Sequence, residues 1–185
     1  MSSDIRKSPV DILNAAFSPK NDGERSTSQG YDHPHSDTII TGAKRILSYT
    51  ATGQELLNFA EEHNIKIKVL KDNKQSGYIP SSDLAIITCP ANQTKVTPAT
   101  VLNFIQAVRE AEQELSGLKR PTGRTTKDEY VRISLEKHED ILVTQFYCSF
   151  ELWQNRQIED LLNEMRKERK EYIDEFVNHM LTNQS

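Results

Sequence analysis

The sequence lacks the features that would assign it to several large classes of protein. Its 185 residues contain two cysteines, Cys89 and Cys148, which are too few for a disulfide framework. No run approaches the roughly 20 apolar residues that a membrane-spanning helix needs. The stretch from Met1 to Phe17 carries scattered charges and no apolar core of a secretory signal. We therefore expect a cytoplasmic protein that does not bind membranes.

Motifs that depend on glycine are also missing. The seven glycines are dispersed, and no G-x-G-x-x-G or G-x-x-x-x-G-K pattern of a nucleotide site occurs. The G-x-S-x-G pattern of serine hydrolases is absent. Cys148 has no evident base partner, so we interpret it as a buried thiol. The formal net charge of -4 argues against nucleic acid as a partner.

The N-terminal part of the chain has little hydrophobic patterning. Residues 1–43 are polar, with Ser, Asp, Asn, Pro and Gly dominating after Phe17, and we expect them to form a disordered arm. His33-Pro34-His35 has the residue types of metal ligands. Because a metal site needs fixed geometry, we interpret these histidines as part of a solvated linker.

A helix and two β segments follow the arm. Thr52-Gly53-Gln54-Glu55 has the pattern of a capping box, which would start a helix that ends near His63-Asn64. Residues 65–70 alternate apolar and lysine side chains, which is typical of a half-buried strand. A second β segment covers residues 78–88. The two segments together predict an antiparallel hairpin.

Three helices complete the chain. Thr97-Pro98 supplies an N-cap and a first-turn proline for a helix that ends at Gly117. Thr126-Lys127-Asp128-Glu129 is a second capping box and starts a long helix through about Trp153. The last helix, residues 158–180, is rich in charge. Its apolar stripe is expected to pack either on the core or on a second subunit.

The order of these elements predicts an α+β fold. We expect a mostly helical domain in which one β-hairpin or small antiparallel sheet packs on three to four helices. The chain divides into the arm of residues 1–43, an α+β domain of residues 44–157 and a C-terminal amphipathic helix of residues 158–185.

Several short strings of the sequence resemble a family of small bacterial zincin-like metallopeptidases. The strings are Gly53-Gln54-Glu55-Leu56-Leu57, Ile65-Lys66-Ile67-Lys68-Val69, Gly77-Tyr78, Ala85-Ile86-Ile87 and Phe150-Glu151-Leu152-Trp153. In that family a hairpin precedes a helix that carries H-E-L-R-H-A-x-Q, and a later helix carries E-A-D-A before an aromatic run. The resemblance covers about residues 53–153 and implies a zincin-like core.

The family motif has lost its metal chemistry in this sequence. In a zincin, two histidines one helical turn apart bind zinc, and the glutamate after the first polarises a water. Here Gln106 and Glu110 stand in place of the two histidines, and Ala107 stands in place of the glutamate. On the later helix His138 replaces the acidic ligand. The family pattern is kept at four positions: Arg109, Ala111, Gln113 and Asp140.

We call Gln106, Arg109, Glu110, Gln113, His138 and Asp140 the remnant positions. Their pattern favours a pseudo-enzyme without catalytic residues, zinc or another cofactor. Such a protein would bind a protein partner through the surface over these positions or through the last helix.

Three other interpretations stay open. In the first, Glu110 and His138, with or without Asp140, form a rearranged metal site of a working peptidase or hydrolase, which requires two helices to converge and still lacks a general base. In the second, the last two helices form a homo-oligomer. In the third, the strings match by chance, and the polar residues of 106–113 are the solvated face of an amphipathic helix.

Overall fold

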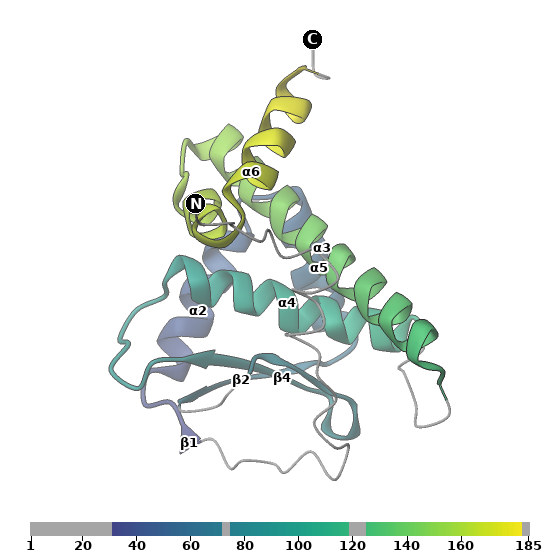
Figure 1. Cartoon of the computed structure of the whole chain (residues 1–185). Helices are drawn as coiled ribbons and strands as arrows, with labels where there is room; N and C mark the ends of the chain where they lie inside the picture. The colour runs from purple at the N-terminus through teal and green to yellow at the C-terminus, as the bar shows by residue number, and fades with distance from the viewer. Residues whose placement is uncertain (1–30, 72–74, 119–124, 183–185) are drawn as a thin grey trace, which may run out of the picture.

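The computed structural model describes residues 31–71, 75–118 and 125–182 (Figure 1). Its elements, in chain order, are β1 (Tyr31–Asp32), α2 (Ser36–Leu47), α3 (Ala51–Glu62), β2 (Lys66–Lys71), β3 (Gly77–Ile79), a short 3-10 turn (Pro80–Ser82), β4 (Leu84–Cys89), α4 (Pro98–Leu115), α5 (Lys127–Arg156) and α6 (Asp160–Thr182). The expected α+β class, dominated by helices, is confirmed. None of the helices in these ranges combines the length and the apolar character that crossing a bilayer requires.

The sheet is mixed, so the expected antiparallel pairing of the two β segments is wrong. The strand order is β1-β2-β4-β3, and β2 pairs with β4 in parallel. The hairpin lies within the second segment, where β3 returns along β4. Pro80 lacks the N–H that a continuous strand needs, and Asp83 adopts a positive φ of 48°, so the chain reverses between them.

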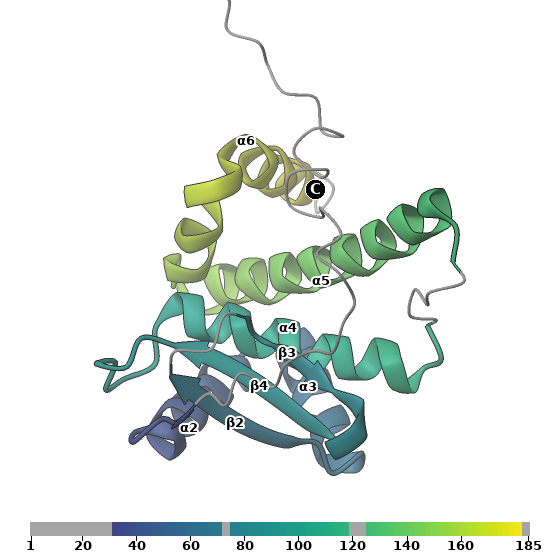
Figure 2. The same ribbon diagram turned by 60° about the horizontal axis from the view of Figure 1, so that its bottom comes forward.

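Both sides of α4 are covered by other elements. The helices lie on one side of the sheet, and α5 and α6 pack beyond α4 (Figures 1 and 2). The main core joins the buried strand residues Val69, Tyr78 and Ile87 to the fully buried Phe104 and Ile105 of α4. Within β2, Lys66 and Lys68 are exposed and alternate with the more buried Ile67 and Val69, as the sequence pattern predicted.

The helix α2 crosses the expected boundary at residue 43. Residues 1–30 of the expected arm lie outside the described residues, but Ile39, Ala43 and Leu47 of α2 are buried at four-residue spacing. His33 is only 3% exposed, and its Nδ1 accepts a hydrogen bond from the His35 backbone N–H. Its Nε2 therefore carries the proton that it donates to the Pro90 carbonyl oxygen, 3.1 Å away. This histidine joins α2 to the sheet and is not part of a solvated linker.

Two of the three expected helix N-caps are confirmed. Thr97 and Thr126 accept N-cap hydrogen bonds at the starts of α4 and α5. At α3 the cap is Thr50, two residues before the expected one, and its hydroxyl accepts from the Gly53 N–H. The N–H and hydroxyl of Thr52 instead donate to Glu151 of α5. The carboxylate at this helix start comes from a distant element, which no local pattern reveals.

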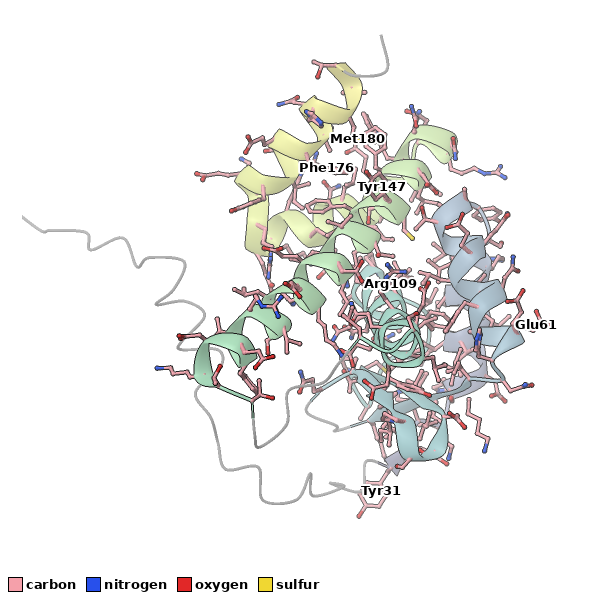
Figure 3. All side chains as sticks on the ribbon, turned by 90° about the vertical axis from the view of Figure 1, so that its right-hand side faces the viewer. Tyr31, Glu61, Arg109, Tyr147, Phe176 and Met180 are labelled. Atoms are coloured by element: carbon pink, nitrogen blue, oxygen red, sulfur yellow. The ribbon has the colours of Figure 1, made fainter. Side chains whose placement is uncertain are left out.

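The apolar stripe of α6 packs within the chain. Leu162, Met165, Ile173 and Val177 form a second core with Phe146 and Phe150 of α5, together with several partly buried side chains. Tyr147, Phe176 and Met180 lie at the edge of this core (Figure 3). Most of the stripe is therefore unavailable to a second subunit.

Replacing Gly53 by alanine should destabilise the α2–α3 turn. An added Cβ would lie 2.9 Å from the carbonyl carbon of Leu47 and closer still to the carbonyl oxygen and to the Thr50 hydroxyl. We expect a loss of about 1–3 kcal/mol in the free energy of unfolding, measured by urea denaturation. The control Asn58→Ala, at an exposed position of α3, should stay within about 0.5 kcal/mol of the wild type. A wild-type midpoint for Gly53→Ala would contradict the packing described here.

Candidate functional site

The remnant positions of α4 form two pairs that face different neighbours. Gln106 and Glu110 are one helical turn apart, as are Arg109 and Gln113, so each pair shares a face. The first pair contacts β3 and the second contacts α5. Ala107, which stands where the resembled motif has its general base, is fully buried in the main core.

Glu110 and Gln106 cover the outer edge of β3. One carboxylate oxygen of Glu110 accepts the Tyr78 backbone N–H at 3.1 Å, and the other accepts from the Gln106 amide at 3.0 Å. The same Gln106 amide lies 3.5 Å from the Ser76 carbonyl oxygen. Because β3 pairs with β4 along its other edge, these side chains satisfy backbone groups that another strand would otherwise bind.

Gly77 makes the approach of Glu110 feasible. A Cβ at residue 77 would stand 2.7 Å from Oε2 of Glu110, well inside van der Waals contact. The glycine also has a φ of 156°, which side chains seldom adopt. The Gly77-Tyr78 string therefore has a local structural reason.

Arg109 and Asp140 join α4 to α5 by a bidentate ion pair. Nε and Nη2 of Arg109 each donate to one carboxylate oxygen of Asp140 at 2.8 Å. Nη1 donates to Glu112 at 2.6 Å. The hydrogen bonds from Arg109 lower the pKa of Asp140 below its ordinary value, and this effect outweighs burial, which acts in the opposite direction. The same contact raises the pKa of the guanidinium.

Gln113 extends this network. Its amide nitrogen donates to Asp140 at 2.7 Å and to the carbonyl oxygen of Lys137 at 3.0 Å. Its amide oxygen is buried and has no hydrogen-bond partner among the residues that the structure describes. The network therefore fixes the crossing of two helices through one charged and one neutral side chain of α4.

His138 faces a different element. Its Nε2 lies 3.0 Å from Nη2 of Arg169 on α6. Burial lowers the pKa of the imidazole first, and the neighbouring guanidinium lowers it further. The preference for the neutral form follows from both effects.

The three candidate ligands of a rearranged metal site have separate partners: the Tyr78 N–H for Glu110, Arg169 for His138, and Arg109 with Gln113 for Asp140. Within residues 31–71, 75–118 and 125–182, no three His, Cys, Asp or Glu side chains lie close enough together to hold a metal ion. In this arrangement five of the remnant positions join α4 to β3 and α5, and His138 joins α5 to α6.

Both cysteines are buried. Burial raises the pKa of the Cys148 thiol to about 12 and also raises the pKa of Cys89. A thiol with such a pKa is protonated at neutral pH and is a poor nucleophile. The interpretation of Cys148 as a structural thiol is supported.

Comparisons with known proteins found no family model, no curated protein and no solved structure that matches this chain significantly. The resemblance to zincin-like metallopeptidases therefore stays a prediction. The functional interpretation depends on the geometry of the site itself.

The sequence patterns did not indicate several residues that complete the site. Ser76 and Tyr78 offer their backbone groups to α4, and Arg169 offers its side chain to α5. Backbone partners carry no side-chain signature. Gly77 is the one local signal, because an isolated glycine at a strand indicates a close approach by another group.

Asp140→Asn should weaken the α4–α5 junction. The ion pair is bidentate and its side chains are 28% and 36% exposed, so solvent screens part of its strength. We expect a loss of about 1–2 kcal/mol in the free energy of unfolding at neutral pH. Glu136→Gln is the matched control, since it removes an exposed ion pair with Arg132 and should change stability by less than about 0.5 kcal/mol. Equal effects of both substitutions would contradict the assignment.

The contribution of Asp140 should also depend on pH. A carboxyl group whose pKa is lower in the folded state stabilises the fold above its unfolded pKa, ordinarily 3.8, and loses that contribution as the pH falls through the folded value. The stability difference between the wild type and Asp140→Asn should be constant near neutral pH and shrink below about pH 4. Urea denaturation across this range measures it, and a difference that grows in acid would refute the assigned ion pair.

Proposed function

We propose that this chain is a non-catalytic, zincin-like protein-interaction module that binds an extended segment of a partner along the outer edge of β3. The observation that carries the proposal is the hydrogen bond from the Tyr78 N–H to the Glu110 carboxylate. This contact places the Glu110 side chain over the outer edge of a strand, where a partner segment would bind. The proposal includes a cytoplasmic location and no bound cofactor.

The chemistry of α4 supports the non-catalytic part of the proposal. Residue 107 is an alanine inside the core, so the position has no group to activate water. Gln106 and Glu110 are joined to each other and to β3. A hydrolase with non-standard ligands would have to break these contacts before either residue could bind a metal.

The outer edge of β3 supports the proposal that the chain binds an extended segment of a partner. An uncovered strand edge is a template for another strand, and many modules recognise extended peptides by adding a strand to a sheet. Here the edge is covered by two side chains, which can change rotamer without unfolding α4. A partner strand would replace the carboxylate at the Tyr78 N–H and the amide at the Ser76 carbonyl.

Removing Glu110 should strengthen the binding of extended peptides. Peptides selected from a random displayed library would be titrated against the wild type, Glu110→Ala and the control Glu112→Ala, and binding located by amide chemical shifts. Since the carboxylate competes for the Tyr78 N–H, we expect Glu110→Ala to bind several-fold to tenfold more tightly. The control removes a neighbouring carboxylate that binds Arg109 and not β3, and should bind as the wild type does. Shifts confined to α6, or no gain in Glu110→Ala, would refute this surface.

The same preparations test for hydrolysis. The selected peptides should stay intact with added zinc, and Glu110→Ala should leave this result unchanged. Cleavage that a chelator abolishes and zinc restores, lost in Glu110→Ala, would establish the hydrolase with non-standard ligands instead.

A further inference from the structure

The last helix is bent at the residue that contacts His138. Arg169 has non-helical backbone angles, φ -142° and ψ 42°, and divides α6 into residues 160–168 and 170–182. Figure 2 shows the change of direction between the two halves. Arg166 and Asp174 form an ion pair across the bend, with 2.9 Å between Nε and Oδ1.

The contact between Arg169 and His138 exists in only one protonation state. A guanidinium donates hydrogen bonds and accepts none, so His138 Nε2 must be the acceptor at 3.0 Å. The imidazole is therefore neutral, with its proton on Nδ1. Protonation of Nε2 would remove the acceptor and place two cations next to each other.

Few other charges act on this imidazole. Glu139, the next residue of α5, favours the charged form, but its effect is smaller than those of burial and Arg169. The charged residues that α4 directs toward this part of α5, Arg109 and Glu114, are engaged with Asp140 and Lys137. On α6, Arg166 is engaged with Asp174.

The C-terminal half of α6, residues 170–182, packs over aromatic side chains of α5. Phe176 stacks on Phe146 with 4.6 Å between ring centroids, and it meets Tyr147 edge-on at 5.7 Å. Ile173 and Val177 are buried in the same core. Figure 3 shows Tyr147, Phe176 and Met180 close together where the two helices meet.

We propose that His138 and Arg169 form a pH-sensitive latch that holds residues 170–182 of α6 on α5 at neutral pH and releases them when the imidazole is protonated. The latched state binds fewer protons than the released state, because the pKa of His138 is lowered only where the imidazole is buried beside Arg169. The latch is therefore closed above the ordinary value of 6.5 and weakens as the pH falls below it. Each unit by which the pKa is lowered favours release roughly tenfold in acid.

Hydrogen exchange tests the latch in the whole chain. Exchange of residues 170–182 would be followed by mass spectrometry at about pH 7.5 and about pH 5, with correction for the intrinsic pH dependence of exchange. The wild type should lose protection there in acid, roughly tenfold for each unit of pKa lowering, while α4 keeps its protection. Trp153, the single tryptophan of the chain, packs against this core and should become more accessible to acrylamide over the same range.

Three variants distinguish the protonation of His138 from other effects of low pH on the fold. His138→Gln keeps a hydrogen-bond acceptor that does not titrate, and Arg169→Gln can donate to the neutral imidazole or accept from the charged one. Both substitutions should abolish the pH dependence of exchange protection in residues 170–182. His63→Gln, at the exposed histidine that directly follows α3, should behave as the wild type. NMR titration of the wild-type imidazole should give a pKa below 6.5 for His138. The proposal would be wrong if residues 170–182 still lost protection in acid in both His138→Gln and Arg169→Gln. It would also be wrong if the pKa of His138 were at or above its ordinary value.

Discussion

The burial of α4 between the sheet and α5 is the constraint on which the rest of the structure depends. Figure 3 shows this helix nearly end-on, with elements around it. Its apolar residues fill the main core, so its polar residues have to find partners on the neighbouring elements. Gln106 and Glu110 find them on β3, and Arg109 and Gln113 find them on α5. A polar face that looks like a catalytic motif in the sequence is a set of contacts between layers in the fold.

This constraint also gives the remnant positions a structural role that does not depend on a metal. Arg109, Gln113 and Asp140 match the resembled family and form one network. Gln106 and Glu110 depart from it and stabilise a strand edge instead. The matching residues hold helices together, which is a role that requires no metal. The departing residues are those that metal ligation would have required.

Sequence patterns predicted the features that depend on local chemistry. The alternation of residues 65–70, the caps at Thr97 and Thr126 and the stripe of the last helix each follow from neighbouring residues, and the structure contains them. The parallel pairing of β2 with β4 depends on contacts distant in the sequence. The helix α2 was missed because its buried residues stand in a polar segment that composition assigns to a linker. At the site, the residues could be named from the sequence, but their partners could not.

The close approach of Glu110 to Gly77 links two positions that are 33 residues apart in the sequence. A side chain at residue 77 requires a shorter residue at 110, and the loss of the glycine leaves the β3 edge without its carboxylate. The two positions are therefore expected to change together in evolution. In diverged sequences, a paired change at these positions would identify a relative of this chain more reliably than any short sequence motif.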